Sequence, residues 1–348
     1  MDDPVTDRKA RSVSRRGAAR GLLIALLGAA VCGIGVVKPA WSAPPKVTLL
    51  WVAVSGSQSV AWVTKEGGYF ERNGVDVDLA YLAGSPIAAA ALVSGRVEFV
   101  QMAGPAVVAA DAQGAHLVMV MGFVNQPLFV LMTTPDVQTP EQLKGKTVAV
   151  SKVGSSDDFM LREALSHWGL RPDTDVKITG VGSVGGQIAA LEKHLVQGAV
   201  VDPPNDVLAQ QAGAHLLARV SDLGIPYQAA GLVTTREYIQ SRAEVVARVV
   251  RAMTQGVHRI KTDRAFSEEI MAKYLKNSNP LIVDAAYESY VNVFARVPIP
   301  SKAGLAEIAK ESASTGLVKG PVDVGAMLDT SFVDKLQASG FIQQLYAK

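Results

Sequence analysis

The chain has 348 residues, of which 34 are Lys or Arg and 32 are Asp or Glu, so its formal net charge is +2. Hydrophobic residues make up 49% and charged residues 19%, against a usual charged share of about 25%. This balance excludes a disordered chain, a collagen-like repeat and a strongly basic protein that seeks nucleic acid. The single cysteine excludes an internal disulfide framework, a cysteine-based zinc site and an iron–sulfur cluster. At roughly 150 residues per domain, the length favours two domains.

Residues 1–43 have the pattern of a cleaved export signal, which predicts a periplasmic protein. A basic start precedes Gly21–Val37, an uncharged and mostly apolar run that is shorter than the ~20 residues of a spanning helix. Small residues then predict cleavage after Ser42 or Ala43, with an uncleaved anchor as the alternative. The basic residues of the start are Arg8, Lys9, Arg11, Arg15, Arg16 and Arg20.

The export route stays open between the twin-arginine and the general secretory pathways. Ser14-Arg15-Arg16 is similar to the start of a twin-arginine signal, but Gly17-Ala18-Ala19 replaces its usual Phe-Leu-Lys. Cys32 is the one candidate for lipidation, and Val31 before it is larger than a lipobox favours. Without residues 1–43 the chain keeps 27 basic and 29 acidic residues, a net charge of −2, and no cysteine. We therefore expect no nucleic-acid partner.

Strands and helices alternate after the signal, which predicts a mostly parallel sheet covered by helices on both faces. Small polar breaks follow the first strands, and a helix is expected after each break. The expected strands are Val47–Val54, Val75–Tyr81, Val97–Met102 and His116–Phe123. The breaks are Ser55-Gly56-Ser57, Gly84-Ser85-Pro86 and Gly104-Pro105, with helices expected up to Phe70, up to Gly95 and over Ala106–Gln113.

The same order of parts then repeats, which predicts two α/β lobes of similar build. We expect strands at Thr147–Ser151, Val176–Thr179 and Ala199–Val201, and helices at Asp157–Trp168 and Gln187–Gln197. The loops between them are Gly154-Ser155-Ser156 and Gly182-Ser183. Lobe 1 is predicted over residues 44–125 and lobe 2 over 126–228, with crossovers near Pro127–Thr134 and Tyr227–Thr234 as hinges.

Residues 229–348 are expected to return to lobe 1 and to end in helices. From Glu237 onward, apolar residues recur at helical spacing between Val245 and Ile260. Further helices are predicted at Ala265–Leu275, Leu281–Phe294, Lys302–Ser314 and Ser331–Tyr346.

The small polar loops are the candidate binding elements. In an open parallel sheet, ligands sit beyond the carboxyl ends of the strands, where helix N-termini present unpaired N–H groups. Glycine lets a ligand approach the backbone there, and serine adds a rotatable hydroxyl. Ordinary helix capping by Ser and Gly is the alternative for any one loop, and the recurrence of such loops in both halves favours one cleft.

One stretch supports a different class of function. Gly180, Gly182 and Gly185 fit the G-x-G-x-x-G pattern between a predicted strand and a helix, and Asp202 follows about 20 residues later. This spacing is typical of dinucleotide binding, so the alternative is an exported NAD(P)-dependent oxidoreductase. Against it, the motif lies in mid-chain and Pro203-Pro204 come directly after Asp202.

Other catalytic and metal-binding patterns are missing from the sequence. The five histidines form no H-E-x-x-H arrangement, and no G-x-S-x-G nucleophile elbow occurs. We therefore expect a protein that is not an enzyme, with no catalytic residue, no metal and no cofactor.

Several segments together resemble the periplasmic substrate-binding proteins of ABC importers, in the group for nitrate, taurine and alkanesulfonates that also includes binders of thiamine precursors. The matching segments are Gly67–Val77 (GGYFERNGVDV), Ala90–Phe99 (AALVSGRVEF) and Pro140–Val150 (PEQLKGKTVAV). The resemblance covers roughly residues 46–300. It implies a two-lobed, type II periplasmic-binding-protein fold whose lobes close on a small organic or oxyanion solute. It places that solute site on Ser55, Gly56, Gly84, Ser85, Gly104, Ser155, Ser156, Ser183 and Asp202.

The resemblance also implies partners: a membrane permease and its ATPase, served by a monomeric receptor. A sensory lobe that feeds a signalling partner would use the same cleft and is the other interpretation. This chain has Asp202-Pro203-Pro204 where the group often has Asp-Ala, and Lys152 is the one basic residue close to a cleft loop, which puts nitrate and sulfonates in doubt. A eukaryotic branch that makes the thiamine pyrimidine resembles this group but uses a cysteine-rich motif, which the exported chain lacks.

Overall fold

The structure is a computed structural model that describes residues 43–314, 316–320 and 322–347. The predicted signal segment, apart from Ala43, lies outside the described residues. Residues 44–348 form one compact unit. Within the described residues, no helix combines the length and the apolar character needed to cross a membrane.

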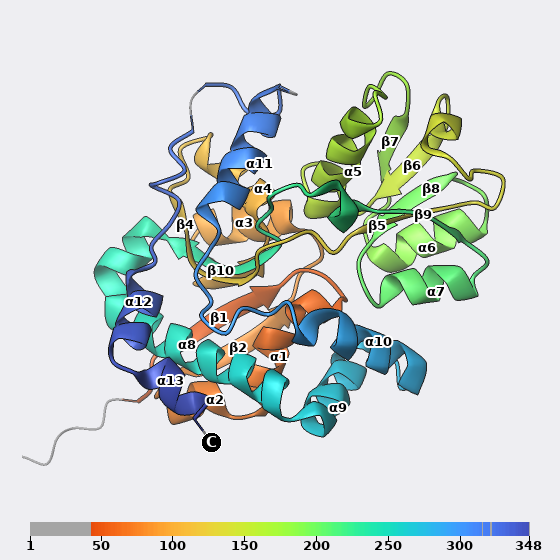
Figure 1. The fold of residues 1–348 in the computed structure, drawn as a ribbon. Coiled ribbons are helices and arrows are strands. Elements are labelled where there is room, and N and C mark those ends of the chain that lie inside the picture. The colour runs from red at the N-terminus through yellow and green to blue at the C-terminus, as the bar shows by residue number, and fades with distance from the viewer. Residues whose placement is uncertain (1–42, 315, 321, 348) are drawn as a thin grey trace, which may run out of the picture. The chain divides into compact units, whose positions relative to one another are not determined.

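Two five-stranded sheets organise this unit (Figure 1). The first has the strand order β2-β1-β3-β10-β4 and the second β7-β6-β8-β5-β9. The strands of the first sheet are β1 (Lys46–Trp51), β2 (Asp76–Tyr81), β3 (Phe99–Met102), β4 (Leu117–Val124) and β10 (Ala230–Thr235). Those of the second are β5 (Val130–Thr133), β6 (Thr147–Val150), β7 (Lys177–Gly180), β8 (Gly198–Val201) and β9 (His215–Arg219). We call each sheet with its helices lobe 1 and lobe 2.

Each sheet is mostly parallel, as the sequence predicted, but contains one antiparallel strand that was not predicted. In lobe 1, β10 pairs antiparallel with both β3 and β4, while β1 pairs parallel with β2 and β3. In lobe 2, β5 pairs antiparallel with β8 and β9, while β6 pairs parallel with β7 and β8. Both antiparallel strands directly follow a crossing of the chain between the lobes, so the two predicted crossover segments contain sheet strands.

The central strands are buried on both faces, which explains their unbroken apolar runs. On β1, Leu49 and Trp51 face one core cluster, while Leu50 faces another on the opposite side of the sheet. Lobe 2 repeats this alternation at Leu131 and Met132 of β5. Because successive side chains of a strand point to opposite faces of the sheet, each of these strands contributes to two cores.

Helices cover both faces of each sheet. In the first part of the chain they are α1 (Ser59–Glu66), α2 (Tyr69–Arg72), α3 (Ser85–Val93) and α4 (Gly104–Asp111). Those of lobe 2 are α5 (Ser156–His167), α6 (Val184–Glu192) and α7 (Asn205–Gln211). The C-terminal helices are α8 (Arg236–Thr262), α9 (Arg264–Leu275), α10 (Pro280–Val291), α11 (Lys302–Ser314), α12 (Ser331–Ala338) and α13 (Phe341–Leu345).

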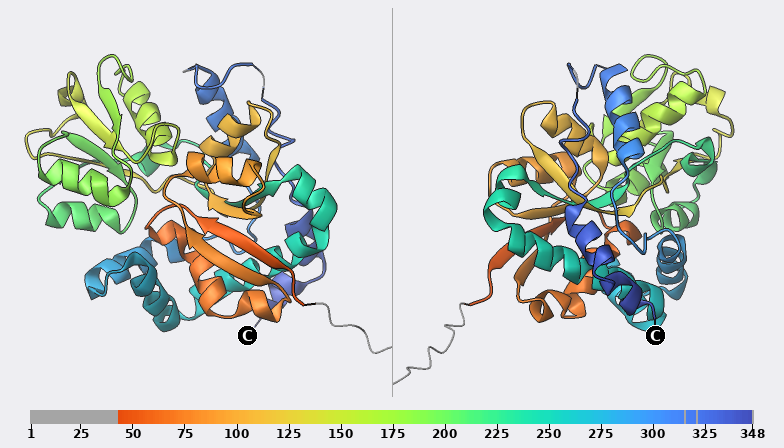
Figure 2. Two further views of the ribbon diagram at one scale, coloured as in Figure 1. Left: turned by 180° about the vertical axis from the view of Figure 1, so that it is seen from behind. Right: turned by 60° about the vertical axis from the view of Figure 1, so that its left-hand side comes forward.

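The C-terminal helices pack on lobe 1. The apolar face of α8 joins the core cluster of β1 and α1, and α12 and α13, dark blue in Figure 2, lie against α8. The single helix predicted over Ser331–Tyr346 is wrong: Gly340, with φ of +74°, separates two short helices. The helix predicted to run to Gln197 ends at Glu192, because His194 takes a left-handed conformation with φ of +54°.

The contact between α1 and α8 depends on a glycine. A Cβ atom on Gly256 would lie 2.0 Å from Thr64 Oγ1 and 3.3 Å from its Cα. We predict that Gly256→Ala lowers the free energy of unfolding by about 1–3 kcal/mol through overpacking. Gly185→Ala in α6 is the matched control, since nothing lies within 4 Å of a Cβ there; it should be neutral or stabilise by up to about 1 kcal/mol. Equal stability of the two variants in denaturant unfolding would contradict the close packing.

Candidate functional site

The carboxyl ends of the parallel strands in both sheets border one cavity of about 60 Å³. Five of the nine predicted residues line it: Gly84 and Ser85 after β2, Ser155 and Ser156 after β6, and Asp202 after β8. The loops that end parallel strands therefore meet across the lobes.

The other four predicted residues lie elsewhere. Ser183 lines an adjoining groove of about 410 Å³, which shares five lining residues with the cavity. Gly104 packs beneath α11, where a Cβ would lie 2.6 Å from Ile308 and 2.8 Å from Leu305; its neighbour Ala103 lines the cavity instead. Ser55 and Gly56 line neither space and take part in a contact between the lobes.

That contact is polar and fully buried. The Ser55 hydroxyl donates to the Asp202 carboxylate, and the Tyr290 hydroxyl on α10 lies 3.3 Å from the same carboxylate oxygen. The Gly56 N–H donates to the carbonyl of Pro203 over 3.3 Å, and the Asn205 amide donates to the carbonyl of Val54 over 3.2 Å. Glycine is needed at position 56, because a Cβ there would lie 2.5 Å from the Tyr290 ring.

Several lining residues were missed by the sequence analysis. Phe129 and Ala229 line the cavity from the two crossovers, just before β5 and β10. Ser57 and Gln58 line it from the turn before α1. Ser57, Phe129 and Ala229 lie within predicted loops or crossovers and Gln58 directly follows one, so their position was a usable signal. Nothing local signalled Tyr290, which lies 88 residues beyond Asp202.

Asp157 is held by four donors at the start of α5. Its carboxylate accepts from the Ser151 N–H, from the Ser151 hydroxyl at 2.9 Å, from the Ser155 hydroxyl and from the Gln187 amide at 2.9 Å. Burial raises the pKa of Asp157, and these hydrogen bonds oppose the rise. Asp158 is different, because it forms a buried ion pair of 2.9 Å with Arg162.

Asp202 has fewer groups than Asp157 to support its ionised form. Burial raises the pKa of Asp202 from 3.8 to about 6, the Ser55 hydrogen bond opposes this, and the nearby Asp157 charge adds to it. In the part of the chain that the structure describes, neither carboxylate pairs with a basic side chain. The site is therefore rich in hydrogen-bond acceptors, and its two carboxylates have no basic side chain beside them among the described residues.

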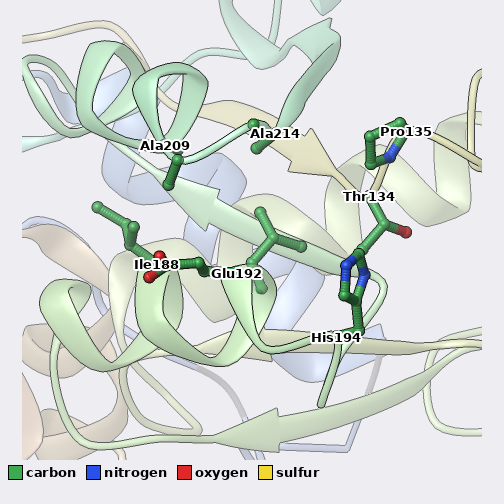
Figure 3. Close-up of a pocket in the computed structure, with 10 residues that line it drawn as sticks. Thr134, Pro135, Ile188, Glu192, His194, Ala209 and Ala214 are labelled. Atoms are coloured by element: carbon green, nitrogen blue, oxygen red, sulfur yellow. The ribbon is translucent and has the colours of Figure 1, made fainter.

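A second hollow of about 170 Å³ lies between α6 and α7 of lobe 2 (Figure 3). Its lining includes Thr134, Glu192 and His194 and none of the predicted site residues. Thr134 follows β5, whose end pairs with the first residue of β8. This hollow thus lies at the amino edge of the parallel strands, opposite the edge where α/β sheets bind ligands.

Comparison with known proteins adds to this geometry. Residues 59–263, more than half of the chain, match the NMT1/THI5-like family. The chain belongs to this family. A curated relative, the formylaminopyrimidine-binding protein of Halalkalibacterium halodurans, is 23% identical over 239 residues, which cover 68% of this chain and 72% of the relative.

Solved structures with the same fold include two binding proteins. The alkanesulfonate-binding protein SsuA of Xanthomonas axonopodis pv. citri, bound to MOPS, has a TM-score of 0.72 at 20% identity and covers 83% of this chain and 100% of its own. The periplasmic nitrate-binding protein NrtA of Synechocystis PCC 6803 has a TM-score of 0.69 at 13% identity, with 84% and 88% covered. The fold of this NMT1/THI5-like protein is thus that of periplasmic binding proteins.

The dinucleotide alternative finds no support in the NMT1/THI5-like chain. Gly182 and Gly185 follow β7, but Asp202 follows β8, and β6 lies between these strands. A Cβ on Gly185 would meet nothing within 4 Å, so the third glycine serves no close helix–strand packing. One oxygen of Asp202 is also occupied by Ser55 and Tyr290 of the other lobe.

The raised pKa of Asp202 predicts a pH-dependent stability that a single substitution removes. With a folded pKa of about 6 against 3.8, this group stabilises the folded protein below pH ~4, and the contribution is lost as pH rises through ~6. Asp202→Asn should match the wild type at pH 4 and exceed its stability at pH 8 by at most about 3 kcal/mol. Thermal unfolding at both pH values checks this, with the exposed Asp222→Asn as control. A stability difference that does not change with pH would contradict it.

Proposed function

We propose that this protein is the extracytoplasmic solute-binding component of an ABC importer, which captures a small solute between its lobes and delivers it to a membrane permease. The observation that carries the proposal is the cavity between the carboxyl edges of two similar sheets. Family membership supports it, since relatives and fold neighbours are named as binding proteins. The export signal expected over residues 1–43 agrees with capture outside the cytoplasm.

The receptor works without chemical conversion of its solute. The lobes would close by bending at the two crossovers, a hinge motion around the ligand. The contacts of Ser55, Tyr290 and Asn205 across the lobes would hold the closed form, and its outer surface would be recognised by the permease. We expect a monomer, because each chain carries both halves of the cavity.

A cavity-filling substitution tests this function even while the solute is unidentified. Ser85 is buried, lines the cavity at the start of α3 and has no side-chain hydrogen bond among the described residues. Ser85→Trp should abolish solute binding while the protein stays folded. Ser94→Trp at the exposed C-terminal end of α3 is the matched control and should bind as the wild type does.

The readout is retention of a natural solute. Each protein is equilibrated with a small-molecule extract and filtered, and the retained compounds are identified by mass spectrometry. We expect one compound retained by the wild type and by Ser94→Trp, lost from Ser85→Trp, and recovered chemically unchanged. Recovery of a chemically converted compound would indicate an enzyme. Retention of NAD(P) alone would support the oxidoreductase alternative. Retention of the compound by both tryptophan variants would refute the cavity as the binding site.

A further inference from the structure

The residues that line the cavity indicate the charge of the solute, which the fold alone does not. This inference rests on the proposed function. Among the described residues, none that lines the cavity or the adjoining groove is Lys, Arg or His. The charged lining residues are Asp157 and Asp202, both buried. Lys152 is not among these lining residues, although its methylene chain packs over Gly84, which lines both spaces, with Cδ 2.8 Å from where a Cβ would stand.

Three serine hydroxyls at the site already lie against these carboxylates. Ser55 donates to Asp202, and the Ser151 and Ser155 hydroxyls both lie within hydrogen-bond distance of Asp157. A hydroxyl has one proton to donate. The Ser85 hydroxyl remains available to a solute, but an anion that takes the protons of the other three would leave buried carboxylates without support.

Helix N-termini at the cavity oppose this negative character. The starts of α3, α4 and α6 border the cavity at Ser85, Ala103 and Val184, and each N-terminus carries a partial charge of about +0.5. The N-terminus of α5 has its own acidic side chains in the first turn. A partial charge at a helix start is not a basic side chain that pairs with Asp202, and the N–H groups of α3 can donate to a neutral oxygen of the solute.

Spare acceptor capacity lies on Asp202. Asp157 already accepts from four donors, as described above. In Asp202, one oxygen accepts from Ser55 and Tyr290, whereas among the described residues the other has only the Asn205 amide at 3.4 Å, a weak contact. Asp202 lines the cavity, so this second oxygen is the acceptor that a solute can use.

The adjoining groove is apolar and larger than the cavity. It measures about 410 Å³ against about 60 Å³, and both share Val52, Ala53, Gly84, Ser151 and Val184. Its other walls include Tyr81 from lobe 1, Leu208 from lobe 2 and Ile282 from α10. A solute that reaches Asp202 through this opening would place its remaining atoms against hydrocarbon.

We propose that the solute is an amphipathic organic cation, with a primary ammonium head in the cavity beside Asp202 and an apolar body in the groove. The ammonium group supplies three donors and a positive charge where acceptors and negative charge predominate. It is compact enough for the small cavity. The apolar body gains affinity by leaving water, at up to about a fourfold increase for each buried methylene.

Three probes of equal chain length test the charge of the solute: hexylammonium, hexan-1-ol and hexanoate, with binding to the full chain measured by calorimetry at pH 8. We expect hexylammonium to bind at least tenfold more tightly than hexan-1-ol, and hexanoate not to bind. Butylammonium should bind more weakly than hexylammonium by up to about 16-fold, because two methylenes leave the groove. Hexanoate binding as tight as hexylammonium binding, or no binding of hexylammonium, would overturn the inference.

Two substitutions then assign the charge that is recognised. Asp202→Asn keeps the shape of the side chain and should weaken hexylammonium at least tenfold, whereas Asp222→Asn, which removes one exposed charge, should not change the affinity. Lys152→Met should leave the affinity unchanged or raise it. Loss of hexylammonium binding in Lys152→Met but not in Asp202→Asn would overturn the assignment. These outcomes are separate from the proposed function, which stands or falls with retention of a natural solute by the wild type and not by Ser85→Trp.

Discussion

The Asp202 carboxylate lies at the end of a strand in lobe 2, yet its hydrogen-bond donors Ser55 and Tyr290 belong to elements packed on lobe 1. A buried carboxylate without hydrogen bonds is strongly unfavourable, so a form of the protein that buries Asp202 must have these donors in place. Two further hydrogen bonds across the lobes, from Gly56 and Asn205, lie directly beside it. The Asp202 contact thus restricts how the two cavity walls can be placed when the lobes meet.

The two lobes reach the cavity by the same plan. In lobe 1, β1 is the middle of three parallel strands, and β6 has the same place in lobe 2. The antiparallel strands, β10 and β5, directly follow a crossing of the chain between the lobes. Parallel strands place all their following loops at one edge, and the two edges face each other across a cavity of about 60 Å³. The lobes also share apolar contacts, since Phe159 and Met160 of α5 belong to the same apolar cluster as Leu305 of α11. Both polar and apolar contacts thus join the lobes.

Local sequence was sufficient to locate a strand or helix where one physical signal dominated. β-branched runs between glycine and serine breaks located β1 to β4 and β6 to β8, and helical spacing located α8 to α11. Local sequence failed for the short elements β9 and α7, which lack a continuous apolar pattern, and at His194 and Gly340, where one left-handed residue ends or interrupts a helix.

The site shows a similar division. Loop position predicted Gly84, Ser85, Ser155 and Ser156 at the cavity, because topology alone brings such loops together, whereas Asp202 was placed there by the family resemblance. It could not predict which hydrogen bonds the serines make. Serine was expected to donate to a ligand, whereas the folded chain directs Ser55 and Ser155 to carboxylates. That choice depends on distances between residues far apart in sequence, and it changes the charge that the site favours in a solute.

The same carboxylate can couple solute capture to closure. In an open form water would solvate Asp202, and closure would bury it, which raises its pKa and opposes closure at neutral pH. A cationic head that enters with closure would supply the missing counter-charge, so its binding free energy would favour the closed form over the open one. A ligand shifts such an equilibrium only by its difference in affinity for the two forms. An anion in the same place would add to the repulsion, and the negative cavity would then discriminate among solutes through the closure step itself.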